Sequence, residues 1–117
     1  MRLFEGSEEF LRDFIHVEDT VKINLHFYKN KSSGIFNAGT GKSRSFMDIA
    51  KIMQDIHGNG KIEYTPFPKD LSGKYQKFTE ACLDNLRQAG FSEDFMTLEE
   101  GIKKYYDQLT SSNGLYI

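Results

Sequence analysis

The sequence predicts a small α/β protein with a few short strands and about four helices. Apolar segments that suit strands alternate with stripes of apolar residues at helical spacing along the 117-residue chain. Capping-box sequences open two of the expected helices, and ten Phe and six Tyr residues supply material for a core. Because strands this few and this short make a thin sheet, we expect exposed apolar surface, or self-association, when the chain is alone.

Four short extended segments are expected. One of them is interpreted as a buried strand that leads into the turn Gly39-Thr40-Gly41. Another ends at Pro66, which cannot donate a backbone hydrogen bond to a sheet. The extended segments are residues 3–4, 13–17, 35–38 and 62–65.

Four helices are expected from apolar residues at helical spacing and from signals at their ends. Ser45 and Thr97 each begin a capping box, in which a hydroxyl and a carboxylate three residues later satisfy free backbone N–H groups. Asp19 is interpreted as a structural helix cap, and Thr79 as the cap of a helix that ends before Gly90. The expected helices cover residues 19–29, 45–57, 79–89 and 97–109, within a domain at 1–110 that is followed by a flexible tail at 111–117.

Composition argues against several classes of partner. A net charge of −2 and the lack of a basic run interleaved with aromatic residues argue against nucleic acid. No apolar run approaches the roughly 20 residues of a membrane span, and no signal peptide is apparent at the first residues. Cys82 is single and fits a reducing compartment, so we expect a soluble cytoplasmic protein with this thiol buried on a helix. His16, His26 and His57 have no partner at metal-ligand spacing, so no metal site is expected.

The segment 39–43, Gly-Thr-Gly-Lys-Ser, has the composition of a phosphate-binding loop but not its spacing. The nucleoside-triphosphatase loop needs a glycine where this chain has Phe36. The dinucleotide-binding fingerprint needs a glycine where this chain has Arg44. We therefore interpret the segment as an ordinary strand-to-helix turn and expect no cofactor-binding residue in it.

Two sequence blocks resemble the C-terminal half of the extended short-chain dehydrogenase/reductase family, which acts on nucleotide-diphosphate sugars. They are RDFIHVED at residues 12–19 and FNAGTG at residues 36–41. Residues 4–14 and 66–81 are further similar to the epimerases of this family that act on ADP-glyceromanno-heptose. The resemblance extends from residue 3 to residue 109. It implies the small substrate-binding domain of such an enzyme, without the complete Rossmann sheet.

The resemblance places Arg12 on the diphosphate of a sugar nucleotide. The chemistry suits this role, because a guanidinium fork matches two phosphate oxygens at once. The alternative is a structural salt bridge, with Asp13 or Glu18 as the partner.

Five other residues complete the implied substrate site. Gly6 would let the backbone approach the ligand, while the Glu5 carboxylate and the Ser7 hydroxyl would hydrogen-bond to sugar or ribose hydroxyls. The alternative for residues 4–7 is a simple turn. Tyr75 would donate to a phosphate oxygen, and its alternative is a core position. The expected substrate-binding residues are thus Phe4, Glu5, Gly6, Ser7, Arg12 and Tyr75.

The implied reaction is epimerisation at C6″ of ADP-D-glycero-D-manno-heptose, a step toward lipopolysaccharide core precursors. The family uses NADP, or NAD, for transient oxidation, with a catalytic tyrosine followed four residues later by lysine. No such pair exists here: the residues four positions after tyrosines 28, 64, 75, 105 and 106 are Ser, Pro, Thr, Leu and Thr. We therefore expect no catalytic residue and no activity from this chain by itself, with the cofactor bound mainly by an N-terminal half of the parent.

The parent enzyme is expected to be a homo-oligomer. Two alternatives stay open. The chain is a non-catalytic binding or assembly module that needs a partner chain, or it is part of another sugar-nucleotide epimerase or dehydratase.

Overall fold

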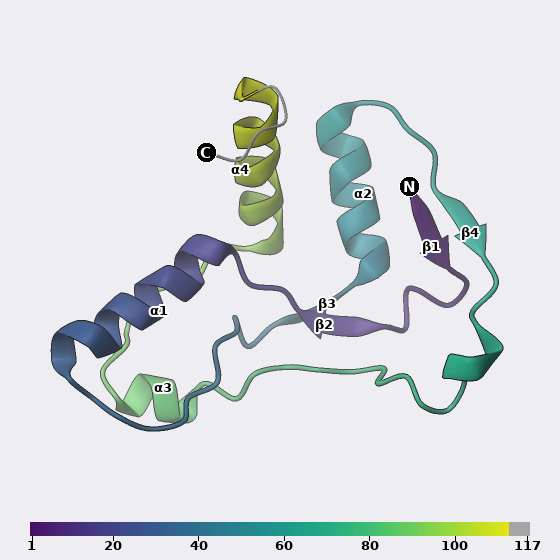
Figure 1. Ribbon diagram of the computed structural model, residues 1–117. Helices are drawn as coiled ribbons and strands as arrows, with labels where there is room; N and C mark the ends of the chain where they lie inside the picture. The colour runs from purple at the N-terminus through teal and green to yellow at the C-terminus, as the bar shows by residue number, and fades with distance from the viewer. Residues whose placement is uncertain (113–117) are drawn as a thin grey trace.

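The molecule is flat, with one small sheet at its centre, the other sheet at one end, and helices at the opposite end and along one side (Figure 1). The computed structural model describes residues 1–112. Its principal-axis extents are 47 × 41 × 19 Å, and its radius of gyration is 16.8 Å, against about 13 Å for a compact domain of this length. The accessible surface of 8300 Å² likewise exceeds the roughly 6,500 Å² of a compact monomer of 13.5 kDa. Much of the surface is therefore left open.

Among the described residues, four strands of three residues each form two separate sheets: β1 (Arg2–Phe4), β2 (Leu11–Asp13), β3 (Ser43–Ser45) and β4 (Glu63–Thr65). β1 pairs in parallel with β4, and β2 pairs antiparallel with β3. On the other side of β2, the Leu11 N–H donates to the Lys77 carbonyl at 2.8 Å, and the Thr79 N–H donates to the Leu11 carbonyl at 3.1 Å. β2 therefore lies between β3 and the segment around Phe78.

Within residues 1–112 there are four α-helices and one short 3₁₀ helix: α1 (Val17–Asn30), α2 (Phe46–His57), η1 (Lys69–Leu71), α3 (Asp84–Gln88) and α4 (Leu98–Ser111). Both expected capping boxes form completely, at Ser45 and at Thr97. α2 ends at His57, as expected, and Gly58 follows it in a left-handed conformation with φ of +75°. Of the expected tail, Ser111 belongs to α4, Ser112 is the C-cap of this helix, and residues 113–117 lie outside the described residues.

The prediction that Asp19 caps α1 is wrong. The cap is His16, whose Nδ1 accepts the Glu18 N–H at 3.2 Å. Asp19 lies in the first helical turn, where it is completely buried. Its carboxylate accepts hydrogen bonds from the Lys22 ammonium at 2.7 Å and from the Met96 N–H at 2.8 Å. Asp19 thus has a structural role, as expected, because its hydrogen bonds connect α1 to the loop before α4.

Two of the expected strands are wrong. The segment 13–17 belongs to a strand only at Asp13; residues 14–16 are in no strand, and α1 begins at Val17. The segment 35–38 is irregular, and Ile35 is 95% exposed. A strand needs a neighbour for its backbone hydrogen bonds, and none of the strands in the described part of the chain lies beside residues 35–38.

The helix expected over residues 79–89 is much shorter, because residues before Asp84 make tertiary hydrogen bonds instead. Thr79 pairs with β2, and the Ala81 N–H donates to the Asp13 carboxylate. Only α3 is helical, so Cys82 lies outside the helix and is exposed rather than buried.

The best-filled core lies between α1 and α3. Ile23, Leu86 and Phe91 are buried there, and Phe27 and Phe95 pack against them. At the other side of the molecule α2 and α4 lie side by side, joined by a 3.0 Å hydrogen bond between the His57 ring and the Tyr106 hydroxyl.

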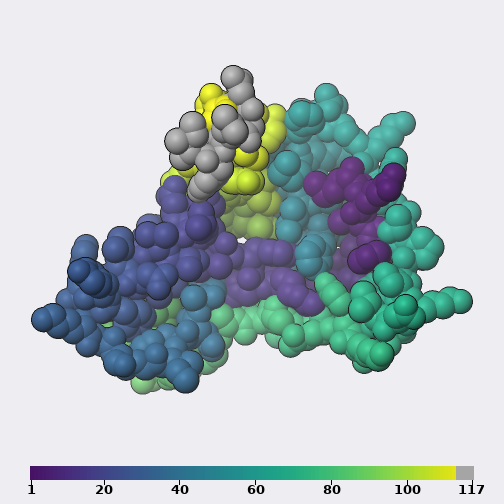
Figure 2. All heavy atoms as spheres, viewed as in Figure 1, coloured from purple at the N-terminus to yellow at the C-terminus, as the bar shows by residue number. Residues whose placement is uncertain are grey.

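The outer surface of α1 is apolar, as expected for so thin a fold. We define the α1 stripe as four exposed residues at helical spacing: Val17, Val21, Leu25 and Tyr28. In Figure 2, α1 and the segment after it form one end of the molecule, and β1, β4 and the segment near η1 form the other. No helix within residues 1–112 has the length and apolar character needed to span a membrane.

Candidate functional site

Four aromatic rings form a cluster at the end of the molecule that carries β1 and β4. We define the aromatic cluster as Phe4, Phe10, Phe67 and Tyr75. Their ring centroids lie 5.0–5.6 Å apart, and three of the four contacts are edge-to-face, which is the favoured geometry. The cluster joins β1, the turn after it and the segment around η1.

A cavity of about 320 Å³ lies beside this cluster, and we call it the aromatic pocket. Its lining comes from β1, β4, the following turns and the start of α2: Arg2, Leu3, Phe4, Ser7, Phe10, Phe46, Thr65 and Tyr75. The walls are mainly apolar and aromatic, which is typical of a pocket that takes a small organic ligand.

The turn after β1 places Ser7 inside this pocket. Gly6 has φ of +79°, a left-handed conformation that suits glycine. The Ser7 N–H donates to the Phe4 carbonyl at 3.1 Å, and the Glu5 N–H donates to the Thr65 carbonyl at 2.9 Å. Ser7 is only 2% exposed, and its hydroxyl has no hydrogen-bond partner among the described residues. The pocket thus holds a buried polar group that is not satisfied.

Arg12 extends over the ring of Tyr75, with 5.0 Å between the guanidinium carbon and the ring centroid. Its Nη1 donates to the Leu11 carbonyl at 2.7 Å, and its Nη2 donates to the Gln76 carbonyl. None of the ion pairs among the described residues includes Arg12, so neither of the salt bridges considered for it forms. The guanidinium is held in place by neutral carbonyl groups, and no carboxylate among the described residues pairs with it.

Asp13 holds the surrounding loops together, a role that was not predicted for it beyond that of a salt-bridge partner. Its carboxylate accepts four hydrogen bonds: from the Thr40 N–H at 2.7 Å, the Thr40 hydroxyl at 2.6 Å, the Gly41 N–H at 2.8 Å and the Ala81 N–H at 3.0 Å. Burial raises the pKa of Asp13, but the hydrogen bonds from Thr40, Ala81 and Gly41 outweigh it and hold the pKa below its ordinary value of 3.8. We call this arrangement the Asp13 junction.

The Asp13 junction leaves no room for a side chain at Gly39. A Cβ at that position would lie 2.6 Å from the Asp13 carboxylate and 2.6 Å from the Ala81 Cβ. The signal for this junction was present in the sequence, because a Gly-Thr-Gly turn carries free N–H groups that need an acceptor. The sequence did not show which carboxylate would supply it.

The structure brings four of the six expected site residues together. Phe4, Ser7 and Tyr75 line the aromatic pocket, and Arg12 contacts Tyr75. Glu5 and Gly6 belong to the turn but are not among the lining residues. Other pocket residues were missed, because their sequence positions indicated only strand or core: Arg2, Leu3, Phe10, Phe46 and Thr65.

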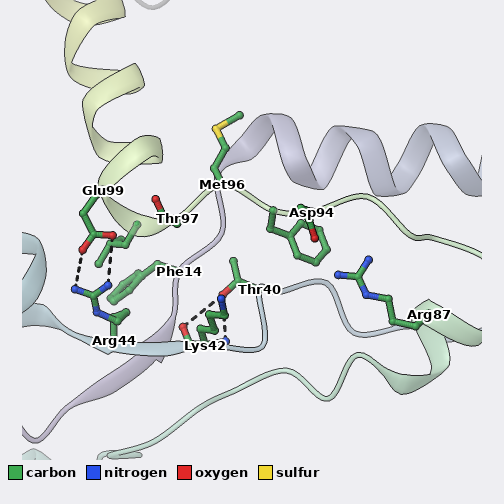
Figure 3. Close-up of a pocket in the computed structure, with 11 residues that line it drawn as sticks. Phe14, Thr40, Lys42, Arg44, Arg87, Asp94, Met96, Thr97 and Glu99 are labelled. Atoms are coloured by element: carbon green, nitrogen blue, oxygen red, sulfur yellow. Dashed lines mark hydrogen bonds and ion pairs between the residues drawn. The ribbon is translucent and has the colours of Figure 1, made fainter.

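A second cavity of about 410 Å³ lies where the Asp13 junction meets the N-terminal end of α4 (Figure 3). Arg44 bonds there to Glu99 at 2.9 Å and also to Asp48 at 3.1 Å, and these carboxylates raise the pKa of Arg44. Arg87 donates to the carbonyls of Phe91 and Glu93. The Arg44 contacts join β3 to α2 and α4, and the Arg87 contacts hold the loop that follows α3. No cluster of His, Cys, Asp and Glu within residues 1–112 has the makings of a metal site.

Comparison with known proteins identifies the architecture. No family model matches the chain. A curated relative, the ADP-L-glycero-D-manno-heptose-6-epimerase of Brachyspira hyodysenteriae, is 50% identical over 115 residues, which are 97% of this chain and 36% of that protein. The crystal structure of the Helicobacter pylori enzyme of the same name matches with a TM-score of 0.81 and 30% identity, over 95% of this chain and 33% of that one. The chain corresponds to the C-terminal part of an extended short-chain dehydrogenase/reductase.

A further relative extends the likeness to another substrate. The UDP-glucose 4-epimerase of Thermotoga maritima, solved with UDP-glucose, matches with a TM-score of 0.77 and 25% identity, over 97% of this chain and 35% of that one. The chain spans about a third of the length of these relatives. The family resemblance found in the sequence is confirmed, and so is the fold class: few short strands, four helices within the described residues and no complete Rossmann sheet.

Proposed function

We propose that the chain forms the sugar-nucleotide-binding part of an epimerase that acts at C6″ of ADP-linked glycero-manno-heptose. One observation carries this proposal: Arg12, which has no acidic partner among the described residues, lies on Tyr75 at the wall of the aromatic pocket. A cation held beside an aromatic cavity suits a ligand that is both anionic and aromatic, as a nucleoside diphosphate is. The names of the relatives at 50% and 30% identity support the ADP-heptose.

In this proposal Arg12 holds the diphosphate and the aromatic pocket holds the nucleoside. The backbone carbonyls of Leu11 and Gln76 fix the guanidinium in one orientation, so little conformational entropy is lost when a phosphate binds. Tyr75 contacts both parts of the site, because its ring lies under Arg12 and also lines the pocket. The heptose then lies beyond the diphosphate.

A nicotinamide cofactor is implied by the family, since related folds have been solved with NAD and with NADPH. The described residues do not fit such a group. The N–H groups of Thr40 and Gly41, which a phosphate would need, are already bound to the Asp13 carboxylate. The sequence also has no dinucleotide fingerprint and no Tyr/Lys pair. We therefore assign no hydride or proton transfer to this chain, and we propose that it is inactive by itself.

Two other functions rest on specific observations. The likeness to UDP-glucose 4-epimerase supports another sugar-nucleotide epimerase or dehydratase, in which Arg12 keeps its role and the base differs. The exposed α1 stripe supports a module that joins a partner chain. Lipopolysaccharide precursor synthesis and a homo-oligomeric parent follow from the principal proposal only.

The test is calorimetric titration of the 117-residue chain with ADP, ADP-mannose as an ADP-sugar surrogate, and UDP. We expect saturable binding of ADP, weakened about tenfold to a hundredfold in Arg12→Ala, because a charge-assisted hydrogen bond contributes about 1.5–3 kcal/mol. Arg12→Lys should recover only part of the affinity, since lysine has no planar fork. Lys77→Ala is the matched control, because Lys77 is an exposed cation nearby that is paired with Glu9.

The outcomes separate the proposals. Equal binding of ADP by the wild type and by Arg12→Ala would overturn the diphosphate role of Arg12. Tighter binding of UDP than of ADP would favour a different epimerase or dehydratase. A folded chain that binds no nucleotide would overturn the proposed function and leave the partner-chain module.

A further inference from the structure

We propose that Asp13 is a positioning residue for the diphosphate, because its carboxylate fixes the segment that orients Arg12. This inference rests on the proposed function and gives the Asp13 junction a part in ligand binding besides its part in stability. The two residues are consecutive in β2, so their side chains point to opposite faces of the strand. They form no ion pair with each other. Asp13 therefore acts on Arg12 through a neighbouring segment of the chain.

The segment 75–81 supplies the contacts of the Arg12 guanidinium that come from outside β2. The Gln76 carbonyl accepts a hydrogen bond from Nη2, and the Tyr75 ring lies 5.0 Å from the guanidinium carbon. Tyr75 is also held by the other rings of the aromatic cluster. Residues 75–81 belong to no helix and to none of the four strands, so the Gln76 carbonyl is placed by what ties this segment to β2.

Hydrogen bonds at alternate residues attach this segment to β2. The Lys77 carbonyl accepts the Leu11 N–H at 2.8 Å, and the Thr79 N–H donates to the Leu11 carbonyl at 3.1 Å. These two bonds have the pattern of a parallel ladder, in which the next bond would run from the Ala81 N–H to the backbone carbonyl of Asp13. The Ala81 N–H donates instead to the Asp13 carboxylate, at 3.0 Å. The side chain thus takes the place of a backbone acceptor in the ladder.

The same carboxylate is anchored in the turn at residues 39–41. Its Oδ1 accepts the N–H and the hydroxyl of Thr40, and its Oδ2 accepts the Gly41 N–H as well as the Ala81 N–H. The carboxylate therefore cannot rotate away from Ala81 without losing bonds to the turn. Hydrogen bonds to an ionised carboxylate are about twice as strong as neutral ones, so this tie on the segment 75–81 is a firm one.

Lys77 and Glu80 add side-chain ties to the segment, but these ties are exposed. Lys77 pairs with Glu9 at 3.0 Å, and their side chains are 65% and 64% exposed. The Glu80 carboxylate accepts the N–H and the hydroxyl of Ser43, also at the surface. Exposed contacts of this kind contribute little, because water competes for the same groups. Loss of the Asp13 carboxylate should therefore loosen the segment and displace the Gln76 carbonyl.

Asp13→Asn, titrated with ADP and with adenosine, tests the inference. Asparagine has one acceptor oxygen in place of two, and its amide group would face N–H groups that also donate, so part of the junction is lost. The affinity for ADP should fall about threefold to tenfold, the usual size of a coupling between neighbouring residues. The affinity for adenosine should stay unchanged, because adenosine has no phosphate for Arg12. A general loosening of the chain would weaken both ligands and would contradict the inference.

Thr40→Ala is the matched control, because it removes a hydroxyl from the same junction and leaves the Ala81 bond in place. Its ADP affinity should stay within about twofold of the wild type, although its stability falls. A second arm repeats Asp13→Asn in the Arg12→Ala background, where no further loss of ADP affinity is expected because no guanidinium is left to orient. Equal losses in the two backgrounds would show that Asp13 does not act through Arg12. NMR titration measures these weak affinities.

Circular dichroism first establishes that each variant is folded. If Asp13→Asn is partly unfolded, trimethylamine N-oxide at one concentration in all samples restores the folded state, and the titrations are made in it. Unchanged ADP affinity in Asp13→Asn, while Arg12→Ala still weakens ADP, would overturn the positioning role and keep the proposed function. Absence of ADP binding by the wild type would overturn both.

Discussion

Both ends of this flat molecule are rich in aromatic side chains, but at one end the rings fill the space between them and at the other they enclose a cavity. Between α1 and α3, Leu86 and Phe91 are at most 1% exposed, and the remaining aromatic residues complete a filled core. Beside β1 and β4, the aromatic cluster borders about 320 Å³ of open volume and a buried hydroxyl without a partner. The comparison shows that aromatic content alone does not mark a ligand site. A cavity that adjoins a buried polar atom without a hydrogen-bond partner is a stronger indication of such a site.

Two arginines make the same point. Arg87 and Arg12 each lie over aromatic rings, at 5.1 Å from Phe95 and 5.0 Å from Tyr75, and each donates to backbone carbonyls. Their immediate contacts are similar. The ring under each arginine also borders a cavity: Phe95 lines the cavity of about 410 Å³, and Tyr75 lines the aromatic pocket. A stacking contact beside a cavity therefore does not by itself indicate that an arginine is available to a ligand.

Truncating one ring at each end would give the largest contrast in stability. We expect Phe91→Ala to lower the free energy of unfolding by about 3–5 kcal/mol, since it removes a large side chain from a filled core. Phe4→Ala should cost much less, below about 1.5 kcal/mol, because Phe4 is 40% exposed and borders open volume. Urea denaturation followed by circular dichroism measures both values. If Phe91→Ala does not fold, Phe91→Leu supplies the smaller step, and equal costs at both ends would contradict the comparison.

The Asp13 junction connects the two ends, so its loss should rank second. Asp13→Asn should cost roughly 2–3 kcal/mol, because a neutral amide replaces a charged acceptor of four hydrogen bonds. The pKa of Asp13 is lower in the folded chain than its ordinary value of 3.8. Its contribution is therefore fully present well above pH 3.8 and is lost as the pH falls through the lower, folded value.

Urea denaturation at a series of pH values between neutrality and pH 3 measures this linkage. The wild type should lose more stability with acidification than Asp13→Asn, since the variant lacks the titrating group. The remaining carboxylates titrate in both proteins and cancel in the difference. Parallel curves would show that the hydrogen bonds to Asp13 do not favour its ionised form.

The sequence predicted the features that depend on neighbouring residues. The capping boxes at Ser45 and Thr97 and the end of α2 at Gly58 formed as expected, because each signal lies within a few residues of the structure it specifies. The failures involve partners far along the chain. The helix expected over 79–89 shortened because Asp13, 68 residues from Ala81, captures its N–H. The strand expected at 35–38 has no neighbouring strand within the described residues.

The residues of the candidate site likewise fall into those that were predicted and those that were not. Phe4, Ser7, Arg12 and Tyr75 were proposed from the family resemblance, and the structure brings them together. Phe10 and Phe46 were not proposed, because an aromatic residue facing a cavity and one filling a core give the same sequence pattern. The unpaired state of the Ser7 hydroxyl was likewise invisible, since it depends on every atom that surrounds it.

Helix capping gives a smaller effect that is confined to α4. Thr97→Ala should cost about 1 kcal/mol, because the Thr97 hydroxyl accepts the Glu100 N–H at 3.2 Å and donates to the Glu100 carboxylate at 3.0 Å. Thr110→Ala, near the other end of the same helix, is the control and should stay within about 0.5 kcal/mol. Equal costs for the two substitutions would mean that the capping box does not stabilise α4. Since Thr97 is not among the residues lining the aromatic pocket, ADP affinity should be unchanged.

The α1 stripe should give the smallest change in stability and the clearest separation of the two ends. Val21 and Leu25 are exposed on the outer face of α1, so the double substitution Val21→Lys, Leu25→Lys should change the free energy of unfolding by less than about 0.5 kcal/mol. Sedimentation velocity should show less self-association than in the wild type, because a charged surface replaces an apolar one. Lys29→Glu, a charge change in the last turn of the same helix, is the control for charge alone. ADP binding should be the same in all three proteins, because the aromatic pocket lies at the opposite end of the molecule. Loss of folding in the double variant would show that the stripe packs within the chain, and unchanged self-association would place the contact between copies elsewhere.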